Sequence, residues 1–296
     1  MLTGYYRHIL ACNPPVEEVF LPWRIGQHLV GWVRPAFAGQ LERFNDIFLG
    51  DGQGLALAPD LHSFEARSAA LDEVARELAA AGITPAYMGE PYAVTPAGRE
   101  RALCVLDRAA AAYFGVRAFG QHLNGFVRRP DGIYMWLGRR ARDRLLFPGA
   151  LDNMVAGGLP HALSLTDNLV KECAEEAGVP EDLARKAVPV GVISYNRVAA
   201  RGFRRDVLYC YDLELPEDFV PRNTDGEVEE FMLLPLQEVA AIVRDTDEFK
   251  LNCNLVVIDF LIRHGWLDPQ TPEYLALVLG LRQPLHGMEN TRFVAG

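Results

Sequence analysis

The sequence predicts an α/β (α+β) fold, with a mixed sheet between helical layers and a smaller α+β domain before it. From about residue 119 onward, strand-like runs alternate irregularly with two or three helical segments, which favours a mixed sheet over a doubly wound parallel one. Before that point, the sequence contains short apolar runs broken by proline and glycine, together with segments of clear helical periodicity. We therefore predict an N-terminal accessory domain over 1–117 and a larger domain over 118–296.

Two helices are predicted in the accessory domain, over 63–83 and 95–116. In the first helix, the apolar residues at helical spacing are Leu71, Val74 and Leu78. The second helix has Thr95 as its N-cap, Pro96 at its first position and Gly115 beyond its end. This second helix would connect the accessory domain to the larger domain.

The larger domain is predicted to open with a hairpin, because strands over 120–130 and 131–141 meet at the turn-forming sequence Pro-Asp-Gly. A helix is predicted next, over 164–178. The later elements are a strand over 187–197, a strand pair around 205–216, an extended stretch over 225–239 and a helix over 252–266.

Composition limits the class of protein. Of the 296 residues, 50% are hydrophobic and 23% are charged, and the net charge is -10. The negative charge disfavours nucleic acid and anionic membrane as partners, and no signal-like or membrane-spanning run is present, so we expect a soluble, cytoplasmic protein. An anionic substrate would then need local arginines or a metal ion. The five scattered cysteines are expected to be reduced, buried thiols.

The helix over 164–178 has strong end signals. Ser164 and Asp167 form a capping-box pattern, and Gly178 followed by Pro180 ends the helix. At about 100° per residue, we predict an apolar face of Leu169, Val170, Cys173, Ala174 and Ala177. The opposite, polar face would carry Asn168, Lys171, Glu172, Glu175 and Glu176.

The three glutamates of this helix stand one turn apart and repel one another, which costs a few tenths of a kcal/mol per pair. A divalent cation would remove this cost, because hard oxygen ligands suit Mg²⁺ or Mn²⁺. The alternative is a solvated acidic face in which Lys171 pairs with Glu175. Helix composition alone leaves both interpretations open.

Residues 157–179 resemble the Nudix (MutT-like) box. The match runs from Gly157 through five residues to Leu163, then through seven residues to Lys171-Glu172-Cys173-Ala174-Glu175-Glu176-Ala177-Gly178-Val179. It departs from the family twice, because Lys171 replaces an arginine and Leu163 replaces the first glutamate. The flanking segments RRARDRLLFPGALDNMVAGGL, VGVISY, YDLELPEDFVPRNTDGEVEEF and NCNLVVIDFLIRHG are similar to one Nudix branch, which has its own N-terminal domain and is related to thiamine pyrophosphokinase proteins.

The resemblance implies a Nudix α/β/α sandwich that hydrolyses a diphosphate with Mg²⁺, or Mn²⁺, as cofactor. It assigns the metal to Glu172, Glu175 and Glu176, with Glu176 also catalytic. The backbone of Gly157 and Gly158 would approach the ion unhindered, and Lys171 would orient a glutamate rather than touch the substrate. The branch implies that the substrate is thiamine diphosphate or its oxy- or oxo- analogues, converted to the monophosphate.

Further acidic and basic groups are expected around the metal. For a base or an additional ligand, the order is Glu227, Glu229 and then Asp225, with an ordinary polar strand edge as the alternative. Arg139 and Arg140 are candidates for the phosphates, with plain surface arginines as the alternative. The weaker candidates are Arg204 and Arg205.

Several other residues are expected to be structural. We assign His122 and Asn124 to polar core or edge positions, His264 to a helix end, and Cys173 to inert packing. Trp23, Trp32 and Trp136 could stack on a substrate but more commonly fill a core.

Other functions stay open at this stage. The diphosphate could carry a nucleoside, a sugar or a dinucleotide, and a non-catalytic ligand sensor is a further alternative. An isopentenyl-diphosphate isomerase is disfavoured, because no cysteine follows a tryptophan-containing strand. The accessory domain could shape the leaving-group pocket or support a homodimer.

Overall fold

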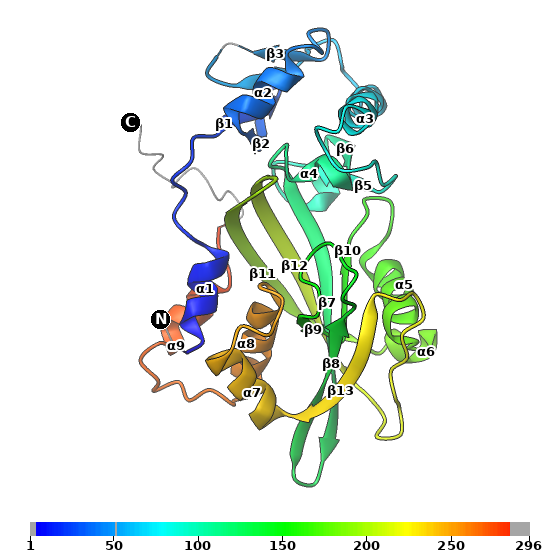
Figure 1. Cartoon of the computed structure of the whole chain (residues 1–296), viewed down its shortest axis with the longest axis vertical. Coiled ribbons are helices and arrows are strands. Elements are labelled where there is room, and N and C mark those ends of the chain that lie inside the picture. Colours follow the sequence, from blue (N-terminus) through cyan, green and yellow to red (C-terminus); the bar gives the residue numbers. More distant parts are fainter. Residues whose placement is uncertain (1–3, 51, 285–296) are drawn as a thin grey trace.

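The computed structural model describes residues 4–50 and 52–284. Figure 1 shows an N-terminal part, α1–α4, lying mostly above a large sheet that belongs to the C-terminal part, β7–α9. The elements of the N-terminal part are α1 (Tyr6–Cys12), β1 (Leu21–Ile25), β2 (His28–Val33), α2 (Pro35–Leu41), β3 (Phe48–Gly50), β4 (Leu55–Leu57), α3 (Phe64–Ala80), β5 (Pro91–Val94), the 3-10 turn η1 (Arg99–Arg101), β6 (Cys104–Asp107) and α4 (Arg108–Ala111).

The C-terminal part contains the large sheet and the helices that cover it. Its elements are β7 (Arg117–Arg129), β8 (Gly132–Arg140), β9 (Leu151–Asn153), β10 (Val155–Gly158), α5 (Leu165–Ala177), α6 (Glu181–Ala184), β11 (Val188–Ala199), β12 (Gly202–Glu214), β13 (Val228–Pro235), α7 (Leu236–Asp245), α8 (Cys253–Arg263) and α9 (Tyr274–Gly280). The predicted hairpin is confirmed, with Arg129 paired to Gly132 at its turn.

The large sheet is mixed, as predicted. Its strand order is β11-β12-β7-β8-β13, and β10 and β9 pair with β7 and β8 respectively. Strands β7 and β12 run parallel, whereas the other pairs in this sheet are antiparallel. Because β7 holds β12 on one side and both β8 and β10 on the other, the long strand β7 is the centre from which the site is built.

Helices cover both faces of the large sheet (Figure 1). Helix α5 packs on one face, around Leu169 and Cys173, whereas α7 and α8 pack on the other, around Val239 and Phe260. The predicted helix–sheet–helix sandwich is therefore confirmed. All five cysteines are buried and free of disulfides, also as predicted.

The N-terminal part has its own core. A four-stranded sheet, β2-β1-β4-β3, and the pair β5-β6 pack against α3, whose Leu71, Val74 and Leu78 are fully buried as predicted. Helix α1 is different, because its Ile9 and Cys12 join the core that contains α8. The domain division at 117/118 stays a prediction, and this first helix packs across it.

The predicted helix over 95–116 is wrong. The segment forms the turn η1, the strand β6 and the short helix α4 instead. Thr95 Oγ1 accepts from Ala97 N and donates to the carbonyl of Gly98, a local turn that competes with a helix. Strand β6 then pairs with β5 and buries Leu106 in the N-terminal core, a long-range contact that overrides the helical pattern.

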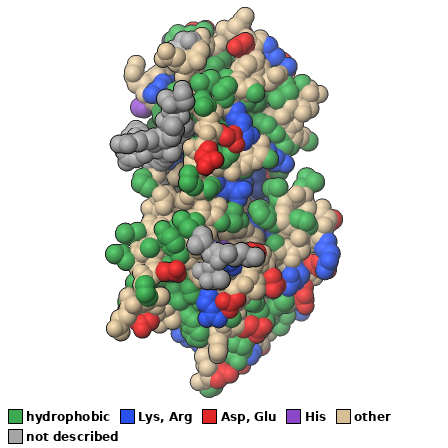
Figure 2. Space-filling model, turned by 60° about the vertical axis from the view of Figure 1, so that its left-hand side comes forward, with side chains coloured by type: hydrophobic (Ala, Val, Ile, Leu, Met, Phe, Trp, Pro, Cys, Tyr) green, Lys and Arg blue, Asp and Glu red, His purple; other side chains and the backbone are tan. Residues whose placement is uncertain are grey.

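In the part of the chain that the structure describes, we find no helix with both the length and the apolar character needed to cross a bilayer. Figure 2 shows acidic and basic side chains interspersed on the lower half of one face, with Lys and Arg side chains gathered where the upper and lower halves meet.

Candidate active site

Helix α5 begins and ends as the sequence predicts. Ser164 Oγ accepts from the backbone N–H of Asp167 at 3.0 Å and caps the first turn. Gly178 ends the helix in the left-handed region with φ of 62°, which a residue without Cβ adopts at no cost. These two ends fix the register of the glutamates against the neighbouring strand β10.

The predicted faces of α5 are partly wrong. Glu176 and Asn168 are buried rather than exposed, whereas Ala174 is exposed rather than buried. The reason is helical geometry, because residues seven apart differ by only about 20° around the axis, so Glu176 lies with Leu169 on the inner face. Only Glu175 of the three glutamates has a carboxylate that is about half exposed.

Glu176 points its carboxylate at β10. Its Oε2 accepts from the backbone N–H of Ala156 at 2.8 Å, and the residue is 8% exposed. Burial raises the pKa of Glu176 to about 8, and the nearby carboxylates of Asp152 and Glu172 add to the shift against the Ala156 hydrogen bond. At neutral pH the protonated form of such a carboxyl is favoured, and a nearby cation would favour the ionised form.

Glu172 lies against the glycine pair of β10. Its carboxylate occupies the space that a Cβ on Gly157 would fill, with Oε2 only 2.6 Å from that position. Burial raises the pKa of Glu172, although the ammonium of Lys171 opposes the shift. Glycine at position 157 is therefore required by the close approach of a carboxylate rather than by an unusual backbone angle.

Lys171 contacts two of the box glutamates. Its Nζ donates to Glu175 Oε2 at 2.6 Å and lies 3.5 Å from Glu172 Oε1. The side chain thus bridges an exposed carboxylate and a half-buried one, and its orienting role stays a prediction. The pairing with Glu175 is also what the solvated-face alternative expects, so this contact alone does not separate the two interpretations.

Two side chains of the N-terminal part reach the strand β10. Gly158 packs against Tyr92 Oη, and the Arg108 Cζ lies 3.2 Å from where a Cβ on Gly158 would be. Arg108 pairs with Glu90 at 2.9 Å and also lowers the pKa of Glu172 through its charge. Arg108 was missed at the level of sequence, because it falls inside the predicted long helix that does not form.

Asp152 is the additional carboxylate beside the box. It is 5% exposed and couples electrostatically to Glu176. Its Oδ2 accepts from Arg140 Nη1 at 3.1 Å and from Lys250 Nζ at 3.0 Å. Asp152 was also missed at the level of sequence, although its place in the strand β9, just before the box, was a usable signal.

His122, Asp152 and Cys253 form a buried group whose ligand-type atoms lie within 4.8 Å of one another. Cys253 Sγ donates to Asp152 Oδ1, and His122 Nδ1 is bonded to Asn153 Oδ1 at 2.8 Å. The ammonium of Lys250 already neutralises Asp152 from its other side. We therefore interpret the group as a polar core, which agrees with the structural role predicted for His122.

The predicted acidic partners form ion pairs with arginines. Glu227 pairs with Arg144 at 2.6 Å, and Glu229 lies 3.6 Å from Arg142. A bulge between Val228 and Glu230 interrupts the alternation that would have put both glutamates on one face. The carboxylates that do raise the pKa of Glu176 are Asp152 and Glu172.

The predicted phosphate arginines end strand β8 as expected, but they are engaged by the protein. Arg140 binds Asp152, and Arg139 donates to the carbonyl of Gly149 at 3.0 Å. Arg204 is held by Asp206 through two hydrogen bonds, and Arg205 is buried in the strand next to Arg117.

Most of the residues expected to be structural are buried or end an element, while Trp32 is half-buried. Trp23 and Trp136 are buried, and Cys173 is buried with its pKa raised to about 12 by burial. Asn124 is buried, and His264 ends α8 and bonds Asp212 at 3.2 Å.

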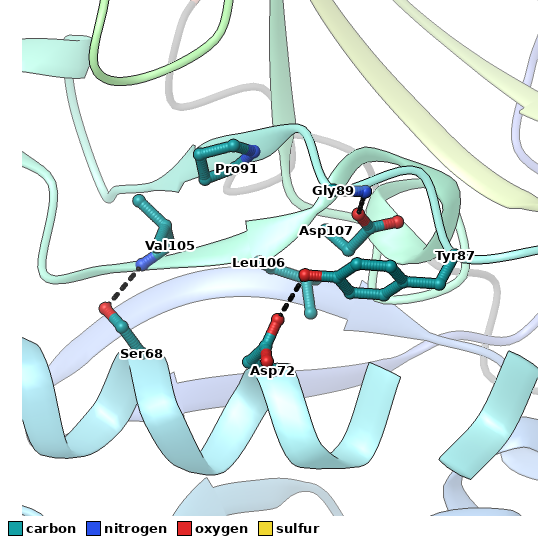
Figure 3. A pocket seen from close by; sticks show the side chains of 8 residues that line it. All are labelled: Ser68, Asp72, Tyr87, Gly89, Pro91, Val105, Leu106 and Asp107. Carbon is teal, nitrogen blue, oxygen red and sulfur yellow. Dashed lines mark hydrogen bonds between the residues drawn. The ribbon is translucent and has the colours of Figure 1, made fainter. Parts of the chain in front are cut away.

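A small cavity of about 150 Å³ opens in the N-terminal part between α3 and the β5-β6 pair (Figure 3). Its polar groups are paired with one another. Tyr87 Oη donates to Asp72 Oδ1 at 2.6 Å, and Val105 N donates to Ser68 Oγ at 3.1 Å. None of its lining residues belongs to the box, so the cavity is not part of the site.

Comparison with known proteins identifies the family. A model described as a domain of unknown function (DUF4743) matches residues 4–118. The chain is 43% identical over 292 residues to Nudix hydrolase 20, chloroplastic, of Arabidopsis thaliana, an alignment that covers 95% of this chain and 78% of that protein. It is 45% identical over 285 residues to Nudix hydrolase 24, chloroplastic, of the same plant, with the same two coverages. The chain belongs to the Nudix hydrolase family.

Membership of the Nudix hydrolases makes this chain a hydrolase that acts on diphosphates. The assignment of residues 157–179 as its Nudix box stays a prediction. Among solved structures, the NUDIX domain of Shewanella oneidensis NrtR, complexed with ADP ribose, is 16% identical with a TM-score of 0.40. That match covers 51% of this chain and 90% of the other.

Proposed function

We propose that this Nudix hydrolase holds a divalent cation with Glu172, Glu175 and Glu176 and uses it to hydrolyse a diphosphate. The observation that carries the proposal is the meeting of α5 and β10. Here the Glu172 carboxylate fills the space left by Gly157, and Glu176 binds the backbone of Ala156. Two desolvated carboxylates with raised pKa values favour a cation between them.

The donor set fits Mg²⁺, with Mn²⁺ as the alternative, because all three side chains offer hard oxygen ligands. When bound, such an ion neutralises phosphate charge and activates water for attack on phosphorus. The protein's own groups then have separate tasks. Lys171 holds Glu175 and Glu172 in place, while Gly157 and Gly158 let the backbone come close.

For the phosphates, we propose Arg108 in place of Arg139 and Arg140. The Arg108 guanidinium lies against Gly158, and its charge acts on Glu172. Arg108 and Glu90 form an exposed ion pair. Such a pair contributes little to stability, so a phosphate oxygen can easily replace the Glu90 carboxylate as the partner of Arg108. Arg140, by contrast, is engaged by the buried Asp152, whose Oδ2 it shares with Lys250.

For the substrate, we propose thiamine diphosphate or its oxidised, toxic analogues, which would be converted to the monophosphate. The support is the resemblance of the segments around the box to that Nudix branch. A nucleoside, sugar or dinucleotide diphosphate is the second candidate, since the metal centre contacts only the diphosphate. A non-catalytic sensor is the third candidate. It is disfavoured because the chain retains Glu172, Glu175 and Glu176.

We propose a reducing compartment such as the cytosol for this chain. The support is that its five cysteines are all buried and unpaired. The two plant relatives are themselves named chloroplastic.

The test is release of phosphate and monophosphate from a panel of thiamine, oxythiamine, oxothiamine and nucleoside diphosphates, with and without Mg²⁺. We expect Mg²⁺-dependent turnover that is fastest on the thiamine-type compounds. Faster turnover of a nucleoside or sugar compound would replace the substrate proposal but keep the chemistry. Equal inactivity on every compound, with the folded protein still binding one of them, would favour the sensor.

A further inference from the structure

The segment between β10 and α5, residues 159–164, is called the box loop here. It joins Gly157 and Gly158 to the helix that carries the glutamates. Its conformation therefore sets the distance between the two glycines and the glutamates. The family pattern has a supporting glutamate in this loop, but this chain has Leu163.

One arginine of the N-terminal part contacts the box loop at three places. Arg99 Nη2 lies within hydrogen-bond distance of the carbonyls of Pro160 at 2.9 Å, His161 at 3.0 Å and Leu163 at 2.7 Å. Arg99 belongs to the turn η1, more than fifty residues before the loop. Guanidinium donors to carbonyl groups are charge-assisted and short, and three acceptors around one nitrogen leave the loop little freedom.

Other groups of the same part hold the loop and its start. The carbonyl of Pro91, in β5, accepts from the backbone N–H of His161 at 2.7 Å. The His161 ring packs on Phe64 of α3 at 5.5 Å, and Tyr92 contacts Gly158 at the end of β10. The N-terminal part therefore contacts the box from its second glycine to the residue before the helix cap.

We propose that Arg99 is a positioning residue of the hydrolase site, which holds the box loop through its carbonyl groups in a chain that has Leu163 where the Nudix box has a glutamate. The N-terminal part is then a working component of the catalytic site. The inference rests on the proposed function in one respect, because it assumes that Glu172, Glu175 and Glu176 hold the metal.

The proposal differs from a purely structural role of Arg99. A residue that only joined the two parts would affect the stability of the whole protein. A positioning residue acts through the loop on the groups that hold the metal. Replacing a group that orients metal ligands typically lowers metal affinity by about 10- to 100-fold. The side chain is only half-buried.

The experiment uses the full chain with Arg99→Gln, Arg99→Lys and, as a matched control, Arg101→Gln in the same turn, where the side chain is exposed. Hydrogen–deuterium exchange reports the protection of the amides in 159–165. Calorimetric titration with Mn²⁺ alone reports metal affinity without substrate. Unfolding temperature and circular dichroism report the fold of each variant.

For Arg99→Gln we expect at least tenfold faster exchange in the box loop, about tenfold weaker Mn²⁺ binding and an unfolding temperature close to wild type. Arg99→Lys keeps the charge without the planar fork and should restore part of both losses. It also keeps the test decisive if the glutamine variant does not fold. Arg101→Gln should behave as wild type.

Two results would overturn the inference. Unchanged loop exchange in a folded Arg99→Gln would show that the loop does not depend on this residue. Faster exchange with unchanged Mn²⁺ affinity would show that Arg99 holds the loop without serving the metal. Failure of the proposed function itself is recognised separately, because the wild-type protein would then bind no Mn²⁺, and the inference would fall with it.

Discussion

At the scale of single residues, the site depends on how closely α5 approaches β10. Glu176 binds the backbone of Ala156, and the Glu172 carboxylate takes the place of a Cβ on Gly157. Burial raises the pKa of both carboxyls. The charge of a bound cation would favour their ionised forms again, so metal binding and proton release are expected to be linked.

Replacing Glu176 by glutamine tests the metal assignment. We expect turnover with Mg²⁺ to fall at least about a hundredfold, because an ionisable oxygen ligand is lost. Folding should be retained, since the amide oxygen can still accept from Ala156 N and a neutral group suits the buried position. Steady-state kinetics and thermal unfolding measure the two effects. Near-normal turnover would show that Glu176 is not a ligand.

Gly157→Ala tests the close approach of Glu172. The added methyl group would lie 2.6 Å from Glu172 Oε2, so the carboxylate must move, and we expect turnover to fall at least about tenfold. The control is Gly39→Ala in α2, where a Cβ meets nothing within 4 Å and should stabilise the helix by ~0.5–1 kcal/mol. Turnover equal to wild type in Gly157→Ala would contradict the geometry.

At the scale of elements, β7, β9 and α8 enclose a polar layer inside an apolar core. His122, Asp152 and Cys253 come from these three elements and are all buried. Asp152 is stabilised by Arg140 and Lys250, so the layer contains a compensated charge. Such a layer fixes the mutual register of its elements, provided that every member keeps its partner.

This layer makes the stability of the protein depend on pH. Burial, helped by the charge of Lys250, lowers the pKa of His122 from 6.5 to about 4. Between these values the unfolded chain binds a proton that the folded chain does not, so the free energy of unfolding falls as pH falls. The full difference corresponds to about 3 kcal/mol.

Urea unfolding at pH 7.5 and 4.5, with wild type and His122→Gln, measures this contribution. We expect the variant to lose less stability between the two pH values than wild type, because the titrating ring is gone. Groups that titrate in this range and lie away from the ring act in both proteins and cancel. An equal loss in both would show that His122 titrates normally in the folded state.

The outcome for individual elements shows where sequence patterns are sufficient. Helices α3 and α5 have caps, periodic apolar residues and clear stops, and both were predicted at nearly the observed bounds. The segment over 95–116 has a helical pattern too, but pairing of β6 with β5 decides its structure. A β-pair depends on contacts outside the segment itself. The local sequence therefore cannot reveal whether the segment forms a helix or a strand.

At the scale of the whole molecule, the N-terminal part meets the box through β5, η1 and α4. These elements bring Tyr92, Arg99 and Arg108 to the end of β10 and the box loop. A protein with a net charge of -10 gains local positive charge there, where an anionic diphosphate would bind.

Arg108→Gln tests this contribution across the two parts. We expect KM for the diphosphate to rise about tenfold or more with little change in kcat, because a charged contact to the bound phosphates is lost. Arg128→Gln is the matched control, since Arg128 also forms an exposed ion pair, with Glu214 at 3.2 Å, at the far end of β7. Equal kinetics of the two variants would remove Arg108 from the site.

From the sequence alone, periodicity and caps determined the helix that bears the box and indicated a mixed sheet between helical layers, while the resemblance of residues 157–179 to the Nudix box indicated the family. The tertiary structure decided which way each glutamate points, and it paired Arg139, Arg140, Glu227 and Glu229 with other protein groups. It also brought Asp152, Arg99 and Arg108 to the box. Burial and electrostatic partners depend on contacts between residues far apart in the chain, and such contacts exist only once the sheet and its two layers have formed.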